Sequence, residues 1–379
     1  MYRALTKLFV LLLFSTLIGC TVSPPEPTPT VHPSPIGSPP TATAILPTAT
    51  SLPARTDRIQ VGGGQPYLLG INYPWLNYGH DFGTTAWGHD GVSSDQSKGT
   101  IEDDFSHLQN QGVHVIRWFL FTDGRASPEF DSDGKVTGFD EYFSKDLDMA
   151  LEIAAKHNIY LILVLFDFHL ADKAQDSSGV QLGGHSQLIT DVEKQQSFLD
   201  NALKPLLEKY KDNKSILAWE VMNEPEGAMN ISGGQWVDES VDASAMQTFV
   251  NAVVESIHTY STQYATVGSA SRQWLSYWTD SKLDFYQYHY YDWMEDQYPI
   301  DYSYTDLKLD KPCIVGEFPT KGTKFTLTQF LDTIWKDGYA GALTWSYRGG
   351  DDASDFNSVE SEFKTWSEAH QADIQIDSK

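Results

Sequence analysis

Cysteine is scarce in this sequence, which has two, Cys20 and Cys313, among 379 residues. No Cys and His residues have the spacing of a zinc site. Cys313 lies in an apolar segment, and we expect it to be a small buried side chain. Asp131-Ser132-Asp133-Gly134 lacks the later acidic ligands of a calcium-binding loop, so we interpret it as a turn. We predict neither a metal nor a cofactor.

Basic residues are also scarce. The chain has 26 Lys and Arg against 51 Asp and Glu, which gives a formal net charge of −25 at pH 7. A polyanion is bound through clustered cations, so this charge argues against a nucleic-acid partner. We interpret the acidity as a source of solubility, and we expect the protein to be a monomer.

The apolar run near the N-terminus is too short to cross a bilayer. Residues 8–18 are apolar and follow Arg3 and Lys7, which is the pattern of a signal peptide. They end in Leu17-Ile18-Gly19-Cys20, which resembles the cleavage box of bacterial lipoproteins. That resemblance implies export, cleavage before Cys20 and a lipid on its thiol, so that the protein is anchored to the cell membrane outside the cytoplasm. The alternative is an ordinary signal peptide and a secreted protein.

Residues 21–54 have almost no side chains that pack into a core. They hold ten of the 18 prolines, mixed with Thr, Ser and Ala. This composition favours extended polyproline conformations and a semi-rigid spacer. We therefore predict a signal peptide over residues 1–20, a disordered Pro/Thr-rich linker over 21–54 and one globular domain over 55–379.

The globular part alternates short apolar runs with amphipathic stretches, as repeated βα units do. Its length suits one α/β domain, a (β/α)8 TIM barrel, which takes about 250 residues plus insertions. Apolar residues at helical spacing predict helices within 143–154, 246–257 and 329–335. The predicted strands are residues 67–71, 113–118, 159–166, 216–222, 265–268, 285–289, 313–316 and 342–345.

Two carboxylates follow predicted strands, at the end of the barrel where chemistry collects. The fourth strand runs into Asn223-Glu224-Pro225, and the seventh runs into Gly316-Glu317-Phe318. Burying a carboxylate at such a place is costly unless its charge is used or paired. Two of them across a barrel mouth suit glycoside hydrolysis, in which one protonates the leaving oxygen and the other attacks the anomeric carbon. The alternative is that both belong to buried ion pairs.

The segment Glu220-x-x-Asn223-Glu224-Pro225 resembles the fourth-strand motif of clan A glycoside hydrolases, and of family 5 in particular, the family of cellulases and β-mannanases. The other elements of that pattern stand in the expected order: Arg117, His169, His289 with Tyr291, Glu317 and Trp345. The resemblance covers residues 70–345. It implies a retaining β-glycosidase that works by double displacement.

Carried onto these positions, the resemblance makes Glu224 the general acid/base and Glu317 the nucleophile. Carboxyl groups ~5–5.5 Å apart resist double ionisation, so one of them is held protonated and serves as the acid. Arg117 and Tyr291 resemble the partners that keep the nucleophile ionised, through a nearby cation and a donated hydrogen bond.

The resemblance also implies substrate contacts. Asn223 would bind the sugar's 2-hydroxyl, and Trp345 would stack on the sugar ring. His169 and His289 would hold other hydroxyls or orient neighbouring carboxylates. Glu220 lies deeper along the strand, and we interpret it as structural.

Aromatic residues are abundant, with 11 Trp and 19 Tyr, and their faces suit the apolar faces of sugars. Trp75, Trp87, Trp118 and Trp293 are candidates for lining a cleft, and we expect half of them to contact sugar. The resemblance favours an endo-β-1,4-glycanase acting on mannan or glucan. An exo-acting β-glycosidase, a transglycosylase and a non-catalytic carbohydrate-binding lipoprotein are the alternatives.

Overall fold

The computed structural model of the protein describes residues 57–376. The predicted signal peptide, the lipidation of Cys20 and the predicted linker lie outside the described residues, and these stay predictions. Within the described part, no helix has both the length and the apolar character needed to cross a membrane.

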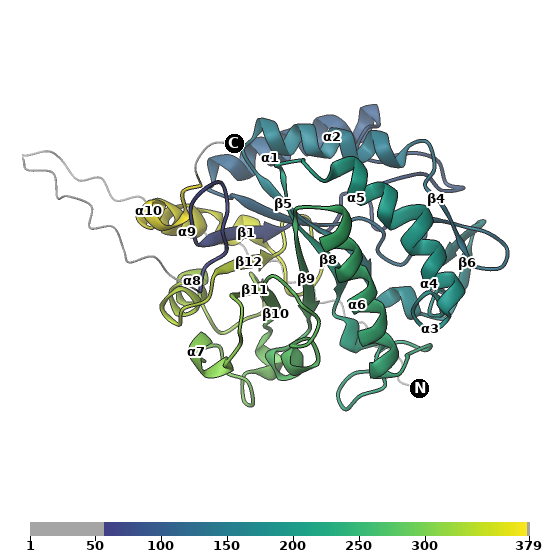
Figure 1. Cartoon of the computed structure of the whole chain (residues 1–379). Coiled ribbons are helices and arrows are strands. Elements are labelled where there is room, and N and C mark those ends of the chain that lie inside the picture. The colour runs from purple at the N-terminus through teal and green to yellow at the C-terminus, as the bar shows by residue number, and fades with distance from the viewer. Residues whose placement is uncertain (1–56, 377–379) are drawn as a thin grey trace, which may run out of the picture. The chain divides into compact units, whose positions relative to one another are not determined.

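Eight parallel strands close into a barrel, in the order β1-β12-β11-β10-β9-β8-β5-β2 (Figure 1). They are β1 (Leu68–Asn72), β2 (Val115–Phe119), β5 (Tyr160–Asp167), β8 (Ile216–Asn223), β9 (Tyr264–Ser269), β10 (Tyr286–His289), β11 (Cys313–Pro319) and β12 (Gly341–Trp345). Each of the eight predicted strands is one of these. The predicted (β/α)8 fold is therefore confirmed.

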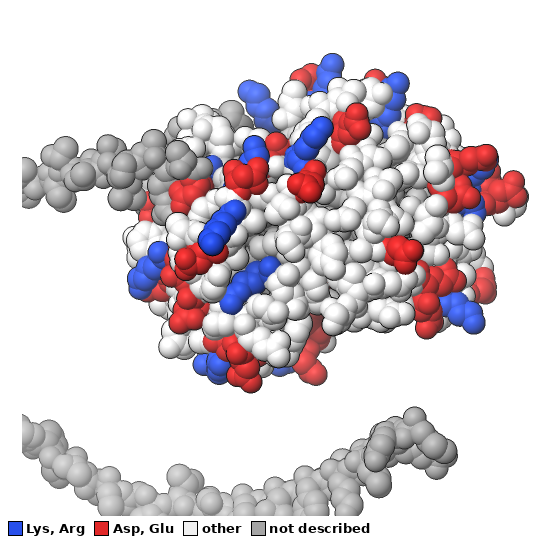
Figure 2. Space-filling view, turned by 60° about the horizontal axis from the view of Figure 1, so that its bottom comes forward, with Lys and Arg blue, Asp and Glu red and all other residues white. Residues whose placement is uncertain are grey.

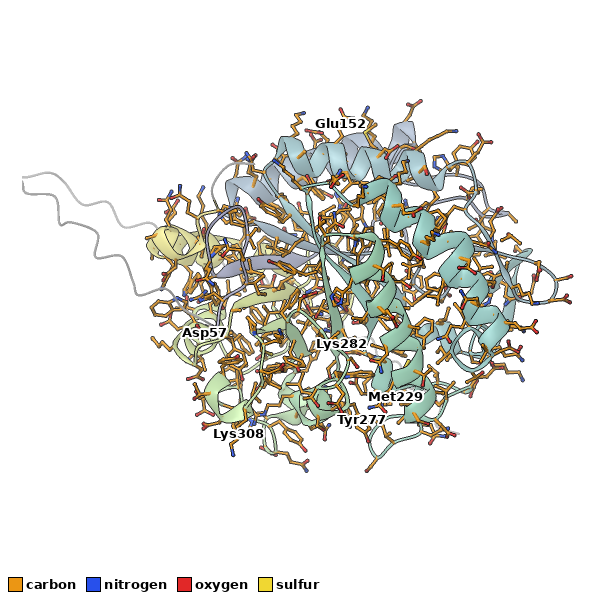
Figure 3. The ribbon with its side chains drawn as sticks, in the orientation of Figure 1. Asp57, Glu152, Met229, Tyr277, Lys282 and Lys308 are labelled. Atoms are coloured by element: carbon orange, nitrogen blue, oxygen red, sulfur yellow. The ribbon has the colours of Figure 1, made fainter. Side chains whose placement is uncertain are left out.

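Helices pack around the outside of the barrel (Figure 1). The long ones are α1 (Asp95–Asn110), α2 (Phe143–Lys156), α4 (Val192–Phe198) continued by η2 (Leu199–Leu203) and α5 (Lys204–Tyr210), α6 (Ala243–Tyr260), α8 (Leu327–Lys336) and α9 (Phe356–Ala369). The apolar stripe of α2 is buried, whereas its exposed Glu152 points away from the barrel (Figure 3). The three predicted helices are confirmed as parts of α2, α6 and α8.

The strands β5, β8, β9 and β10 are followed by short helices near the barrel mouth. These are η1 (Phe168–Ala171), η3 (Pro225–Ala228), η4 (Arg272–Tyr277) and η5 (Asp292–Met294). Three further short helices are α3 (Gln187–Thr190), α7 (Tyr304–Leu307) and α10 (Gln371–Ile374). Among the described residues no long helix follows β9 or β10, so the alternation of strands and long helices is interrupted there. It resumes with α8 after β11.

Two small hairpins lie outside the barrel, β3 (Glu129–Phe130) with β4 (Val136–Gly138), and β6 (Gln175–Ser177) with β7 (Val180–Leu182). The predicted turn at residues 131–134 connects β3 to β4. The Asp131 carboxylate accepts the backbone N–H groups of Asp133 and Lys135, each at 2.9 Å. These bonds stabilise the turn.

The inside of the barrel changes character along its axis. At the amino ends of the strands, side chains such as Val115 and Ile162 form an apolar layer. Ile59 and Val61, which precede β1 in the chain, belong to the same layer. Alternation along β2 then points Arg117 into the barrel one step further on. Cys313 is buried, as predicted. On the face in Figure 2, basic side chains lie singly among acidic ones.

The start of α8 allows a simple test of the fold's local energetics. Thr326 accepts the Gln329 N–H, and the Gln329 side chain accepts the Thr326 N–H, which forms a capping box. We expect Thr326→Ala to destabilise the protein by about 1 kcal/mol. Thermal unfolding measures this loss. Thr328→Ala, in the same helix but without a capping bond, is the control, and an equal loss in both variants would contradict the capping argument.

Candidate active site

The guanidinium of Arg117 lies fully buried at the carboxyl ends of the strands. Its Nε and Nη2 donate to the two oxygens of Glu220, at 2.7 and 2.6 Å. Nη1 donates to Asn72 Oδ1 at 2.8 Å and to Glu317 Oε1 at 2.6 Å. Nη2 also donates to Asn223 Oδ1 at 2.7 Å. All five N–H groups of this side chain are therefore used.

Glu317 occupies the part of β11 that reaches this layer. Oε1 accepts from Arg117, and Oε2 accepts the Tyr291 hydroxyl at 2.6 Å. Burial raises the pKa of Tyr291 well above its usual value, so the phenol stays protonated and donates a hydrogen bond. The neighbouring Tyr290 donates to Glu295 instead.

Burial raises the pKa of the Glu317 carboxyl above its usual value. The charge of Arg117 and the bond from Tyr291 act in the opposite direction, as the sequence predicted, but they do not outweigh burial. The carboxyl group is thus nearly buried and is held in place by two donors.

Glu224 follows β8 in the left-handed region, with φ 46° and ψ 50°. Its N–H donates to the Gly268 carbonyl at 2.6 Å, which ties the turn to β9. Few residues other than glycine adopt this conformation without cost, and such strain is typical of functional sites. Burial raises the pKa of Glu224 to about 8, and the charge of Asp167 adds to the rise. This carboxyl is therefore protonated at neutral pH.

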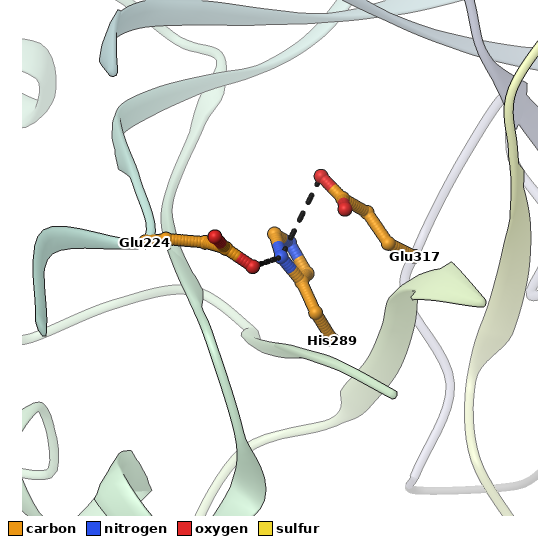
Figure 4. A group of neighbouring side chains, drawn as sticks. All are labelled: Glu224, His289 and Glu317. Carbon is orange, nitrogen blue, oxygen red and sulfur yellow. Dashed lines mark hydrogen bonds and ion pairs between the residues drawn. The ribbon is translucent and has the colours of Figure 1, made fainter. Parts of the chain in front are cut away.

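His289 stands between the two carboxyl groups (Figure 4). Nδ1 lies 2.8 Å from Glu224 Oε1 and 3.5 Å from Glu317 Oε1. Burial lowers the pKa of His289 to about 4, so the ring is neutral at neutral pH. A carboxylate oxygen of each glutamate and a ring nitrogen of His289 lie within 4.8 Å of one another. The carboxyl separation fits the short spacing of retaining glycosidases.

The same three residues are the group, within residues 57–376, whose donor atoms are close enough to share a metal ion. Arg117 already places a cation 2.6 Å from Glu317. We assign no metal to the group, and the absence of a metal stays a prediction.

The cleft around the carboxyl groups has a volume of about 670 Å³. Its wall includes Trp75 and Trp293 from the four tryptophans considered above, together with Trp345. Trp118 is buried in the core and donates to Asp81 at 2.9 Å, and Trp87 lies outside the cleft wall. Two of the four candidates therefore line the cleft, and their contact with sugar stays a prediction.

The remaining predicted residues lie at the cleft in different ways. Asn223 is nearly buried between Arg117 and Asp167, to which its Nδ2 donates at 2.6 Å. Trp345 closes β12, and its Nε1 donates to Asp351 at 2.8 Å. His169 lies in η1 on the cleft wall, and its Nδ1 is 2.7 Å from Asp172. Its ring contacts Asp172 and Asp167 rather than Glu224 or Glu317.

Several cleft residues were not found from the sequence, among them Asp167, Trp236 and Asp351. Asp167 ends β5 directly beside Asn223, and the rule that reacting groups end strands would have found it. Trp236 and Asp351 come from long loops after β8 and β12, where neither periodicity nor strand position gave a signal.

The comparisons with known proteins agree with this geometry. The family model "Cellulase (glycosyl hydrolase family 5)" matches residues 77–337. The chain belongs to glycosyl hydrolase family 5. This family 5 enzyme is 30% identical, over 355 residues, to the mannan endo-1,4-beta-mannosidase of Mytilus edulis. The alignment covers 81% of this chain and 91% of that protein.

Solved structures give the same family. The endo-1,4-beta-mannanase of Eisenia fetida has a TM-score of 0.71 and 27% identity, covering 82% of this chain and 93% of that one. The beta-mannanase of Mytilus edulis has a TM-score of 0.71 and 26% identity, covering 85% and 97%. The family 5 enzyme described here is therefore a retaining glycosidase that hydrolyses O-glycosyl bonds.

Gly268 generates a prediction about the buried layer. A Cβ at this position would lie 2.2 Å from Glu220 Oε1 and 3.0 Å from Arg117 Nη2. We expect Gly268→Ala to push Glu220 off the guanidinium and to cost about 1–3 kcal/mol of stability, with a clear loss of kcat. Thermal unfolding and initial rates measure both.

The control is Gly99→Ala in α1, where a Cβ meets nothing within 4 Å. It should leave the rate unchanged and keep or raise stability. Wild-type stability and kcat in Gly268→Ala would contradict the packing argument.

Proposed function

We propose that this enzyme is an endo-β-1,4-mannanase, with Glu224 as general acid/base and Glu317 as nucleophile. The observation that carries the proposal is the pair of carboxyl groups, which lie within 4.8 Å of each other and of His289. Burial raises the pKa of Glu224 to about 8. Glu317 is held by Arg117 and Tyr291. Relatives named as mannan endo-1,4-beta-mannosidases align over about four-fifths of this chain and most of their own length, which supports mannan as the substrate.

In the first step, a Glu317 oxygen attacks the anomeric carbon while Glu224 gives its proton to the leaving glycosidic oxygen. The bond to the departing sugar breaks, and a glycosyl ester of Glu317 forms. Arg117 and Tyr291 hold the carboxylate in position for the attack. Asn223 would bind the 2-hydroxyl, a contact that strengthens in the oxocarbenium-like transition state.

In the second step, the ionised Glu224 takes a proton from water, and the water oxygen attacks the anomeric carbon. The Glu317 ester bond breaks, and the sugar leaves with its configuration retained. A sugar hydroxyl in place of water would give transglycosylation. Trp345 would stack on the ring that is cleaved, and His169 and His289 would hold substrate hydroxyls or neighbouring carboxyl groups.

Endo action is supported by aromatic walls on both sides of the carboxyl groups. Trp75, Tyr78 and Trp345 come from the β1 and β12 side of the barrel mouth. Trp236 and Trp293 come from the loops after β8 and β10, and they are 43% and 66% exposed. Stacking faces in both directions suit a glycan chain that extends past the cleavage point on either side.

Product analysis tests the substrate and the mode of action together. Mannan, mixed-linkage glucan, cellulose, xylan and aryl glycosides are incubated with the enzyme. We expect mannan to give a series of oligosaccharides from the first minutes. Release of monosaccharide alone would favour an exo-acting β-glycosidase, and preference for glucan would move the substrate to the other β-1,4-linked candidate. Binding without turnover of any substrate would favour a carbohydrate-binding protein.

Substitution of the two carboxyl groups gives different signatures. Glu317→Gln should lower kcat below about a thousandth of wild type while it keeps glycan binding. Glu224→Ala should lose about 10²–10⁴-fold, and azide should restore turnover of an activated aryl glycoside to a glycosyl azide of retained configuration. Near wild-type turnover in Glu317→Gln, or no rescue of Glu224→Ala, would refute the assignments.

The pH dependence follows from the state of each group. Glu224 must be protonated to act as acid, so kcat/KM should fall as pH rises through about 8, the pKa of its carboxyl in the free enzyme. Glu317 must be ionised, so its raised pKa places the acid limb above the usual range for a glutamate. A profile that stays flat above pH 9 would contradict the role of Glu224.

We also propose that the enzyme is exported and held to the cell membrane by a lipid on Cys20, and that it acts as a monomer. The support is the segment Leu17-Ile18-Gly19-Cys20 after an apolar run. Labelling of expressing cells with a fatty acid tests the anchor. Cys20→Ser should lose the label and leave the membrane fraction, whereas an unlabelled wild-type protein in the medium would indicate an ordinary signal peptide.

A further inference from the structure

Asp167 lines the same cleft as the proposed acid Glu224. It is the last residue of β5 and pairs in register with Asn223 of β8. Oδ2 accepts the Asn223 amide at 2.6 Å, and Oδ1 accepts the His169 N–H at 2.9 Å. The side chain is nearly buried, yet it forms part of the cleft wall.

These bonds fix the orientation of the Asn223 amide. Its oxygen accepts from Arg117 and its nitrogen donates to Asp167, so the amide is held from both ends. A flipped amide would place oxygen against carboxylate and nitrogen against guanidinium, which is unfavourable at both contacts. One N–H of the amide nitrogen remains for a sugar hydroxyl.

Among the described residues no Lys or Arg pairs with Asp167, and the nearby His169 ring is a cation only when it is protonated. The five N–H groups of Arg117 go to other acceptors, and the His169 ring nitrogen is 3.9 Å away. Glu220 shares its charge with Arg117, whereas Asp167 accepts from uncharged N–H groups of Asn223 and His169. The negative charge of Asp167 therefore opposes the ionisation of Glu224 and raises the pKa of that carboxyl group.

We propose that Asp167 is a positioning residue for proton transfer: it aims the Asn223 amide at the substrate, and its charge keeps Glu224 protonated until the leaving group departs. The inference rests on the proposed function in that Glu224 is taken as the acid. It extends that function by a residue that acts through its two neighbours.

Other ionisable groups around Glu224 come from several strands and loops. They are Arg117 on β2, His169 in η1, Glu220 on β8, His289 on β10, Tyr291 after β10 and Glu317 on β11. His289 is neutral at neutral pH, and Arg117 opposes the effect of Asp167. A protonated His169 would also oppose it, so the effect of Asp167 should be largest where His169 is neutral.

The test is the pH profile of kcat/KM for Asp167→Asn, on the β-glycan that the wild-type enzyme hydrolyses. This change keeps the size of the side chain and one of its two hydrogen bonds but removes the charge. The alkaline limb should move to lower pH by about half a unit or more. Asp167→Glu, which keeps the charge, should restore the limb toward its wild-type position. Thermal unfolding of each variant checks that it is folded.

Asp172→Asn is the matched control. It removes a negative charge from the end of the same short helix, where Asp172 contacts His169 and not Asn223. Its alkaline limb should not move to lower pH. An equal downward shift in both variants, or a uniform loss of rate in Asp167→Asn with the limb in place, would overturn the proposal.

A measurement without turnover separates this proposal from the proposed function. The side-chain carboxyl signal of Glu224 in ¹³C-labelled protein, assigned by its loss in Glu224→Gln, is titrated in wild type and in Asp167→Asn. A lower titration midpoint in the variant supports the role of Asp167 even for an enzyme inactive on mannan. An unchanged midpoint refutes it even for an active mannanase.

Discussion

The buried guanidinium of Arg117 is the contact on which the rest of the site depends. Its acceptors come from β1, β8 and β11, and a planar guanidinium offers its N–H groups in fixed directions. The registers of these strands must therefore be right at the same time. A buried ion pair that loses one partner typically costs about 3–5 kcal/mol, because the other charge stays buried and unpaired. The arrangement is a constraint on geometry more than a source of stability.

The barrel separates folding from chemistry along its axis. Within single strands the inward side chain changes from apolar to charged, from Val115 to Arg117 and from Ile314 to Glu317. The apolar layer gives the strands a core that needs no precise partners. The charged layer is stable only when each donor has an acceptor. It consists of Arg117 and the side chains that accept its five hydrogen bonds. Gly268 belongs to this layer since no side chain fits beside Glu220.

The sequence predicted the parts of the structure that repeat. Eight apolar runs gave the eight barrel strands, and the order of motifs placed Glu224, Glu317 and Tyr291 at strand ends. Alternation along a strand places His289 and Tyr291 on the same side, which agrees with the contact of Tyr291 with Glu317 and of Tyr290 with Glu295.

What the sequence could not give depends on loops and on the balance of opposing effects. Trp236 enters the cleft from a long loop, so its position follows from tertiary packing against Phe168 and Trp274. The net pKa of Glu317 depends on how burial compares with Arg117 and Tyr291, which needs distances. Asp167, two residues before His169, is not part of the family pattern, so the resemblance gave no signal for it.

The cover over the amino end of the barrel has a consequence for how the cleft is presented. Ile59 and Val61 belong to the apolar cluster at the amino ends of the strands, so the first described residues lie at this end of the barrel. The cleft opens at the other end, about one strand length away. The described chain therefore begins on the side of the domain opposite the mouth. A polymer that approaches the mouth does not meet residues 57–61, and the whole rim of the cleft stays free for it.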